Sequence, residues 1–218
     1  PYFMLKEIFE QPGVIGSTLS SFVNPQTRTI ELPDMPFAWA DVPKVTLVAC
    51  GTSSYAALVA KYWFEEIAGI AVEWDIASEF RYRAHHLPEG GVALFISQSG
   101  ETADTLAALR FAREQGQHIL AFVNVPDSSM AREADLVLGT HAGPEIGVAS
   151  TKTFTTQLTV LACLVISAAK AGGAIGHERE AVLSAALMEV PARAADVLNH
   201  DEKLRAIAKN LAEARDVL

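Results

Sequence analysis

Cysteine is scarce in this chain of 218 residues, which contains only Cys50 and Cys163. These two residues are far apart and match neither a CxxC pair nor a disulfide scaffold, so a reducing compartment, the cytoplasm, is the simplest expectation. The six histidines include one adjacent pair, His85 and His86, and no H-x3-H or HExxH spacing. The sequence therefore predicts no protein-bound metal.

Glycine motifs for nucleotide binding are also missing. No GxGxxG follows an expected strand and no GxxxxGKS/T occurs, so a dinucleotide cofactor and a Walker-type triphosphate site are not expected. A serine hydrolase elbow needs G-x-S-x-G, and the sequence around Ser99 lacks the first glycine. No cofactor is therefore predicted.

Basic residues are outnumbered, with 17 Lys and Arg against 26 Asp and Glu and a net charge of −9. No cluster of Lys or Arg offsets this balance, so neither nucleic acid nor a membrane surface is an expected partner. A signal peptide is not indicated, because the first ten residues already carry three charged side chains. The longest uncharged stretch, between Lys152 and Lys170, is mostly apolar only over 158–169, which suits a buried helix rather than a membrane span.

Half of the residues are apolar, and many of them gather in five short runs separated by helical patterns. The runs cover residues 45–50, 71–76, 92–96, 118–125 and 136–138, and helices are expected over about 53–67 and 102–115. Near-continuous apolar strands that alternate with helices are typical of a parallel sheet covered on both faces. The sequence therefore predicts the α/β class, as a three-layer αβα sandwich with a five-stranded parallel sheet.

Three regions are expected along the chain. Residues 1–42 predict an N-terminal helix, interrupted at residues 11–13 (Gln-Pro-Gly), and a proline-rich linker over the surface. Residues 43–172 contain the expected sheet and form the ligand-binding domain. Residues 173–218 are rich in alanine and in charge and predict one or two amphipathic helices.

Two of the expected strands end in similar clusters of hydroxyl side chains. The first strand ends in CGTSS at residues 50–54 and the third in SQSGET at residues 97–102, and each cluster leads directly into a helix. In open parallel sheets, ligands bind outside the carboxyl ends of the strands. A helix N-terminus offers unpaired N–H donors and about half a positive charge. This arrangement suits a phosphate monoester held without Arg or Lys, so a small phosphorylated metabolite is the expected ligand.

Simpler interpretations compete with ligand binding at several residues. For Ser53 alone, helix capping is favoured over ligand contact, whereas the hydroxyls and the amide within residues 97–102 exceed what capping needs. Before the buried helix, an N-cap at Ser150 or Thr151 is favoured over a loop across the sheet. A solvated Lys152 is favoured over a Schiff-base lysine.

The candidate acids, bases and nucleophiles also have ordinary explanations. Glu101 and Glu145 are the carboxylates nearest the expected pocket, but their spacing does not mark an acid/base pair. Cys50 is expected to be a small core residue rather than a nucleophile. Solvated loop positions are expected for the histidines at 85, 86 and 141.

Three segments together resemble the sugar isomerase (SIS) family: SQSGETADT at residues 97–105, CGTS at 50–53 and EIGVASTK at 145–152. With the lead-in MLKEIFEQP at 4–12, essentially the whole chain is similar to the first of two SIS domains in the glutamine–fructose-6-phosphate aminotransferase family. The resemblance implies the SIS fold and a phosphosugar ligand. That family converts fructose 6-phosphate to glucosamine 6-phosphate with ammonia from glutamine, for amino-sugar (UDP-N-acetylglucosamine) synthesis.

The resemblance also implies roles for individual residues. Those implied to bind the phosphate are Ser97, Gln98, Ser99, Thr102 and Ser53, and those implied to contact the sugar are Thr52, Val148 and Ser150.

The same resemblance places the catalytic groups elsewhere. The family's glutaminase domain needs an N-terminal cysteine, whereas this chain begins at Pro1. Its catalytic glutamate, histidine and lysine belong to a second SIS domain, which would follow Leu218. No catalytic residue is therefore assigned, glutamine is expected to bind a domain absent here, and the chain alone is expected to be inactive. Because SIS domains usually pair, an exposed apolar face and a homodimer are expected.

Two other functions stay open. A sugar-phosphate-sensing SIS domain of a transcription regulator would carry a helix-turn-helix, whereas the N-terminal region predicts one helix and a linker. A stand-alone phosphosugar isomerase would need acid/base groups, such as Glu101 or His86, donated across an oligomer interface.

Overall fold

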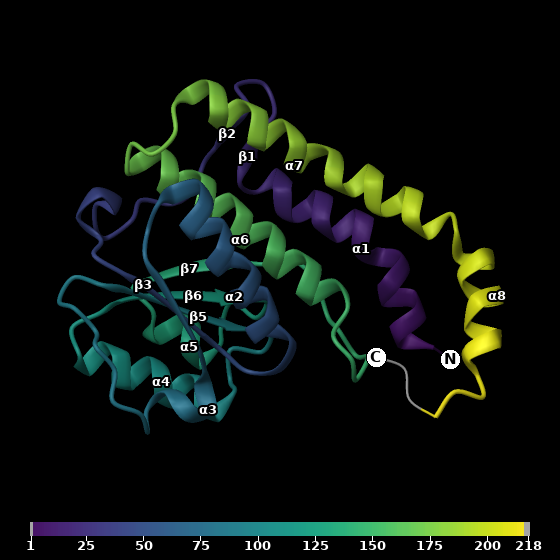
Figure 1. Ribbon diagram of the computed structural model, residues 1–218, viewed down its shortest axis with the longest axis horizontal. Coiled ribbons are helices and arrows are strands. Elements are labelled where there is room, and N and C mark those ends of the chain that lie inside the picture. Colours follow the sequence, from purple (N-terminus) through teal and green to yellow (C-terminus); the bar gives the residue numbers. More distant parts are fainter. Residues whose placement is uncertain (1, 216–218) are drawn as a thin grey trace.

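Five parallel strands form the centre of the molecule in the computed structural model, which describes residues 2–215 (Figure 1). The strands are β3 (Val45–Ala49), β4 (Val72–Ile76), β5 (Val92–Ser97), β6 (His118–Val123) and β7 (Leu136–Gly139). Their order in the sheet is β4-β3-β5-β6-β7. The predicted α/β class and five-stranded parallel sheet are therefore confirmed. Pro1 of the expected N-terminal region and residues 216–218 of the C-terminal region lie outside the described residues.

Helices cover both faces of the sheet, as Figure 1 shows. One face packs against α2 (Gly51–Trp63), which continues as a π-helical turn, η2 (Phe64–Ala68), and against α6 (Lys152–Ala171). The other face packs against α3 (Ala77–Phe80), α4 (Ala103–Glu114) and α5 (Ser129–Glu133). Side chains alternate along β3, so that Leu47 packs in the core on the side of α2 and α6, whereas Val48 packs in the core on the side of α3, α4 and α5. Both are fully buried, which explains why the central strands form continuous apolar runs in the sequence.

Two further helices form a layer outside α6 (Figure 1). α1 (Phe3–Ser20) packs on α6, and α7 (His177–Leu198) packs on α1. Between α1, α6 and α7 runs a groove of about 660 Å³, lined mainly by apolar side chains. α8 (Asp201–Leu211) has no buried residue and exposes Leu204, Ile207 and Leu211. The expected C-terminal helices are therefore present, and they leave apolar surface exposed.

Pro12 lies inside α1 without ending it, so the predicted interruption at residues 11–13 is wrong. A proline lacks the N–H that would bond the carbonyl four residues earlier, which here belongs to Ile8. The side-chain amide of Gln11 donates to that carbonyl at 3.1 Å and replaces the missing bond. The helix therefore continues to Ser20.

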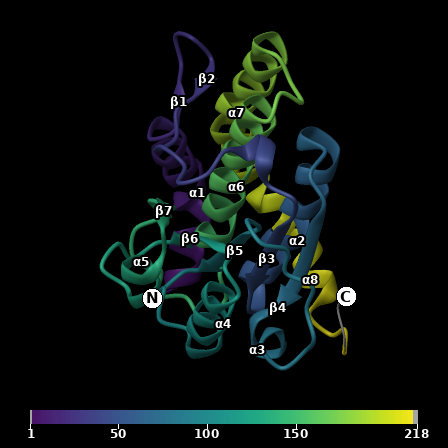
Figure 2. The same cartoon turned by 90° about the vertical axis from the view of Figure 1, so that its left-hand side faces the viewer.

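The proline-rich segment after α1 is more ordered than the surface linker expected from the sequence. It contains a short antiparallel pair, β1 (Val23–Asn24) and β2 (Thr29–Ile30), beside α7 (Figure 2). A 3-10 turn, η1 (Trp39–Asp41), follows. Trp39 is only 4% exposed and packs edge-on against Phe37, with ring centroids 5.0 Å apart. The ring of Trp39 also lies 6.1 Å from that of Phe64 in η2, and this contact fixes the segment to the core.

α6 is the one described helix that is long and apolar enough to span a membrane, and most of it is buried inside the protein. It begins at Lys152, earlier than the expected helix at 158–169, because its polar first turns are also helical. Thr153, Thr156 and Gln157 in these turns are buried, and each makes a side-chain hydrogen bond. The helix is therefore a core helix of the sandwich, with a polar end.

Candidate functional site

The direction of the sheet connections changes between the neighbouring strands β3 and β5. From β3 the chain passes through α2 to β4 on one side, whereas from β5 it passes through α4 to β6 on the other side. Ligands of open α/β sheets bind at such a switch point, outside the carboxyl ends of the strands. A pocket of about 180 Å³ lies there, lined by Cys50, Ser53, Ile96, Ser97, Gln98, Ser99, Thr102 and Thr105.

The connection from β5 to α4 is folded by its own hydroxyl groups. Ser97 Oγ accepts the N–H of Gly100 at 3.0 Å and lies 3.2 Å from Thr102 Oγ1. Ser99 Oγ accepts the N–H two residues further on at 3.2 Å. Gly100 has a φ of 66°, and its carbonyl accepts the N–H of Met130 at 3.1 Å, which anchors the connection to α5. The backbone therefore holds three hydroxyl side chains around one small space.

Side-chain capping does not account for these hydroxyls. Thr102 is the N-cap residue of α4 and Cys50 that of α2, and neither makes a side-chain cap hydrogen bond. Ser53 lies inside α2, where its Oγ accepts a hydrogen bond from Nε2 of Gln157 at 3.0 Å. The capping interpretation favoured for Ser53 is therefore wrong. The first N–H groups of both helices lack a side-chain cap and add their partial positive charge to the pocket.

The size and charge of the pocket suit a phosphate group. Pockets for whole small molecules measure about 300–1,000 Å³, and this one, at about 180 Å³, is smaller. Among the described residues its lining contains neither Lys nor Arg, so attraction for an anion comes from hydroxyl and backbone donors and from two helix dipoles. The apolar groove between α1, α6 and α7 is larger, but it offers few such donors.

Two polar residues of this site were not predicted from the sequence. Thr105 lies one helical turn after Thr102, and its buried hydroxyl has no partner among the described residues. Gln157 donates to Ser53, while its own Oε1 is buried and also unpartnered within residues 2–215. The one-turn spacing could have indicated Thr105. No local pattern indicates Gln157, because it is 104 residues away from Ser53.

The three residues implied to contact the sugar do not line the pocket. Thr52 is exposed on the first turn of α2, and Val148 is fully exposed on the connection between β7 and α6. Ser150, on the same connection, shares a hydrogen bond of 2.6 Å with Thr153 Oγ1. The structure thus brings together the five residues implied for the phosphate and leaves these three outside the lining.

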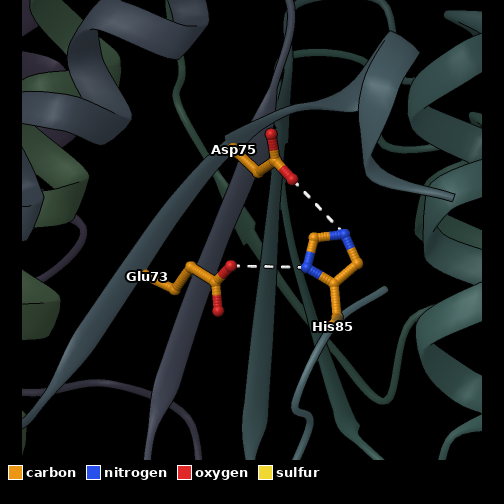
Figure 3. Close-up of side chains that lie close together, drawn as sticks. All are labelled: Glu73, Asp75 and His85. Atoms are coloured by element: carbon orange, nitrogen blue, oxygen red, sulfur yellow. Dashed lines mark hydrogen bonds and ion pairs between the residues drawn. The ribbon is translucent and has the colours of Figure 1, made fainter. Parts of the chain in front are cut away.

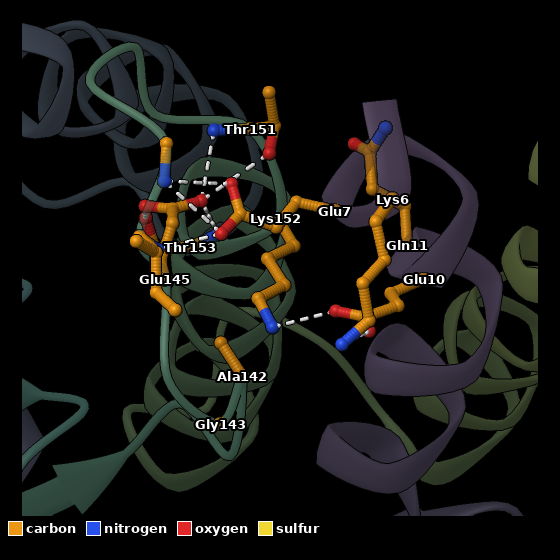
Figure 4. A network of polar contacts seen from close by, with 12 residues as sticks. Lys6, Glu7, Glu10, Gln11, Ala142, Gly143, Glu145, Thr151, Lys152 and Thr153 are labelled. Carbon is orange, nitrogen blue, oxygen red and sulfur yellow. Dashed lines mark hydrogen bonds and ion pairs between the residues drawn. The ribbon is translucent and has the colours of Figure 1, made fainter. Parts of the chain in front are cut away.

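Lys152 is buried rather than solvated, so the expectation from the sequence is wrong (Figure 4). Its side chain is 5% exposed, and its Nζ lies 2.7 Å from Glu10 Oε2 on α1. The hydrogen bond from Lys152 holds the pKa of Glu10 below its ordinary value. A lysine paired with an ionised carboxylate does not suit a Schiff base, which needs a neutral amine.

The two carboxylates nearest the expected pocket are engaged elsewhere. Glu101 accepts the N–H of Ser129 at 2.6 Å, and this bond lowers the pKa of Glu101. Burial acts to raise the pKa of Glu145, but hydrogen bonds from Thr153 and Thr151 outweigh it and lower that pKa. Carboxyl groups with a lowered pKa are ionised at neutral pH and are poor general acids. Neither residue therefore suits the general-acid role that a stand-alone isomerase would need.

A separate cluster beside the edge strand β4 joins Glu73, Asp75 and His85 (Figure 3). Nδ1 of His85 lies 3.3 Å from the Glu73 carboxylate, and Nε2 lies 3.4 Å from the Asp75 carboxylate. Nε2 is also 2.6 Å from the carbonyl oxygen of Phe80, so it must carry a proton to make that hydrogen bond. The side chain of His85, only 2% exposed, is therefore buried and hydrogen-bonded, whereas a solvated position was expected.

The surroundings of this cluster argue against a metal ion. The Glu73 carboxylate is already paired with Lys44, and the Asp75 carboxylate is paired with Arg83 at 2.6 Å. Protonated Nε2 of His85 has no lone pair to offer a metal, and Nδ1 lies 3.3 Å from the Glu73 carboxylate, which is within hydrogen-bonding range. The contacts are those of an ion-pair network between β4 and the segment that follows α3.

Comparisons with known proteins bear on the family and the fold of the chain. The profile of the SIS domain matches residues 40–167. A glutamine–fructose-6-phosphate aminotransferase (isomerizing) of Bradyrhizobium diazoefficiens is 53% identical over 218 residues, which are 100% of this chain and 36% of that protein. The chain thus spans little more than a third of the length of the curated relatives that it matches.

Solved structures resemble the fold over most of the chain. The C-terminal domain of glucosamine-fructose-6-phosphate aminotransferase from Francisella tularensis matches with a TM-score of 0.93 at 37% identity, covering 98% of this chain and 60% of that one. A glucosamine-6-phosphate deaminase from Thermotoga maritima matches with a TM-score of 0.66 at 25% identity, covering 86% of this chain and 54% of that one.

Proposed function

Because the chain belongs to the SIS-domain family, we propose that the pocket between β3 and β5 binds the phosphate of fructose 6-phosphate or glucosamine 6-phosphate. The observation that carries this proposal is the set of hydroxyls at two helix N-termini, at the switch point of the sheet. Ser97, Ser99, Thr102 and Ser53, with the amide of Gln98, are the proposed phosphate ligands. A phosphate monoester carries about −1.5 to −2 charges at neutral pH, which the two helix dipoles stabilise.

The sugar itself must extend beyond this pocket. A volume of about 180 Å³ accommodates the phosphate but leaves little room for six carbons and their hydroxyls. Thr52, Val148 and Ser150 are the proposed sugar contacts. All three lie outside the pocket lining, which is where a ligand anchored by its phosphate would present its sugar.

For the whole protein, the proposed activity is glutamine-dependent amination of fructose 6-phosphate in cytoplasmic amino-sugar synthesis. The match of all 218 residues of this chain to part of a glutamine–fructose-6-phosphate aminotransferase supports it. No residue of the chain is assigned a catalytic role, since Glu101, Glu145 and Lys152 are held in other hydrogen bonds. The chain alone is therefore proposed to bind the phosphosugar without converting it, and glutamine is proposed to bind outside it.

The proposal includes a homodimer. The apolar groove between α1, α6 and α7 and the exposed leucine and isoleucine side chains of α8 supply apolar surface of the kind that subunit contacts bury.

Protection of a thiol tests ligand binding at the proposed pocket. Cys50 lines the pocket and is half-buried, so bound fructose 6-phosphate is expected to slow its alkylation by iodoacetamide at least about fivefold. Cys163 is an internal control, because it is fully buried and burial raises its pKa to about 12. Free fructose should protect neither thiol. Alkylation of Cys50 at the same rate with and without fructose 6-phosphate would contradict the proposal.

A further inference from the structure

A buried carboxylate on α1 holds a distant part of the chain through backbone N–H groups. Glu7 is 3% exposed, and its Oε1 accepts the N–H of Ile146 at 2.6 Å. The N–H of Gly147 lies 3.1 Å from both carboxylate oxygens. These partners are 139 and 140 residues away from Glu7. A buried charge is costly unless it is hydrogen-bonded, so the carboxylate and the two donors hold each other in place.

The same helix also holds the end of this segment. Glu10 lies one turn after Glu7 on α1, and its carboxylate pairs with the buried ammonium of Lys152, as Figure 4 shows. At the start of the segment, Glu145 accepts the N–H groups of Thr151 and Thr153 at 2.9 and 3.2 Å. The segment 145–152, called here the clasped loop, is therefore closed on itself and fixed to α1 near both ends.

Apolar packing contributes little to the order of the clasped loop. Ile146 is 61% exposed and Val148 is fully exposed. Its backbone is therefore held in place mainly by hydrogen bonds to carboxylates. Val148 and Ser150, the proposed sugar contacts, lie within it. These contacts therefore lie on a backbone that is held by the carboxylates of Glu7, Glu145 and Glu10.

Space at the anchor is also restricted. A Cβ added at Gly147 would lie 2.5 Å from Glu7 Oε2 and 3.4 Å from the Cα of Met4. Only glycine lets the backbone approach the carboxylate this closely. An alanine at this position must displace either the carboxylate or the loop.

We propose that Glu7 is a positioning residue, whose carboxylate sets the conformation of the clasped loop and thereby the affinity for the sugar part of the ligand. The proposal rests on the proposed function, because it assumes that Val148 and Ser150 meet the sugar. It separates two determinants of affinity. The pocket between β3 and β5 recognises phosphate, and α1, through the clasped loop, makes the site prefer a sugar phosphate over phosphate alone.

The test compares Glu7→Gln with wild type in two measurements. In amide hydrogen exchange, Ile146 and Gly147 are expected to exchange at least about tenfold faster in the variant, because the amide replaces one acceptor oxygen by a donor. In calorimetric titrations, affinity for fructose 6-phosphate is expected to fall about tenfold, while affinity for inorganic phosphate stays within about twofold. Gly147→Ala should reproduce both effects, and combining the two changes should add little to either alone.

Glu180→Gln is the matched control. Glu180 on α7 is also buried, at 4% exposure, and accepts a backbone N–H, that of Ile30, at 3.2 Å. Its variant should lose stability without changing exchange in the clasped loop or affinity for either ligand.

Unchanged exchange at residues 146 and 147 in Glu7→Gln would show that Glu7 does not hold the clasped loop. Faster exchange with an unchanged preference for the sugar phosphate would overturn the role in affinity. A wild-type chain that binds fructose 6-phosphate no better than phosphate would instead contradict the proposed sugar contacts, and with them this role.

Discussion

Replacing Gly100 with alanine is expected to abolish measurable phosphosugar binding and to destabilise the chain. Gly100 has a φ of 66°, and an alanine in the left-handed region costs about 1–2 kcal/mol. An added Cβ would also lie within 2.5 Å of the Cβ of Ser128 and within 3.1 Å of a methyl group of Val123. Overpacking of this kind typically costs about 1–3 kcal/mol. The backbone must therefore move, and it carries the hydroxyls at residues 97, 99 and 102 with it.

Gly116→Ala separates backbone strain from displacement of the site. Gly116 has a φ of 72°, but a Cβ there meets nothing within 4 Å. In urea unfolding, the free energy of unfolding of this variant should fall by the cost of a left-handed alanine alone, about 1–2 kcal/mol. Its affinity for fructose 6-phosphate should equal that of wild type. Equal affinities for the two alanine variants would show that the β5–α4 connection does not hold the ligand.

Thr102→Val is expected to weaken binding of fructose 6-phosphate about ten- to a hundredfold. Valine keeps the shape of threonine but removes the hydroxyl, so the ligand loses a hydrogen bond to a charged group, which contributes about 1.5–3 kcal/mol. Ser97 Oγ, 3.2 Å from Thr102 Oγ1, loses its neighbour as well. Thr102→Ser should restore most of the affinity.

Ser184→Ala is the control for this substitution. Ser184 lies on α7, and its hydroxyl is buried and unpartnered among the described residues, so its removal deletes a hydroxyl that does not line the pocket. Its affinity for fructose 6-phosphate, measured by calorimetry, should equal that of wild type. A Thr102→Val variant that also binds within about twofold of wild type would remove Thr102 from the phosphate site.

The sheet was predictable because its signals are local. Each central strand is buried on both faces and is therefore an uninterrupted apolar run, and the two hydroxyl clusters follow directly after β3 and β5. Because β3 and β5 are neighbouring parallel strands, their carboxyl ends bring these clusters together, and the five residues expected at the phosphate lie in one pocket.

The features that the sequence did not indicate depend on distant partners. Lys152 is buried because Glu10, 142 residues away, meets its ammonium group. The interaction of Gln157 with Ser53 spans 104 residues. Spacing along the chain contains no trace of such pairs, since they exist only once α1, α2 and α6 have packed together.

Anchoring of the ligand by its phosphate between β3 and β5 is tested by titrating the unmodified chain with fructose 6-phosphate, inorganic phosphate and free fructose in a calorimeter. We expect saturable binding of fructose 6-phosphate, weaker binding of phosphate at the same site, and no binding of fructose. Competition between the two phosphate-bearing ligands should be complete. A folded chain that binds neither of them, or that binds fructose as tightly as fructose 6-phosphate, would show that the pocket between β3 and β5 is not a phosphate site.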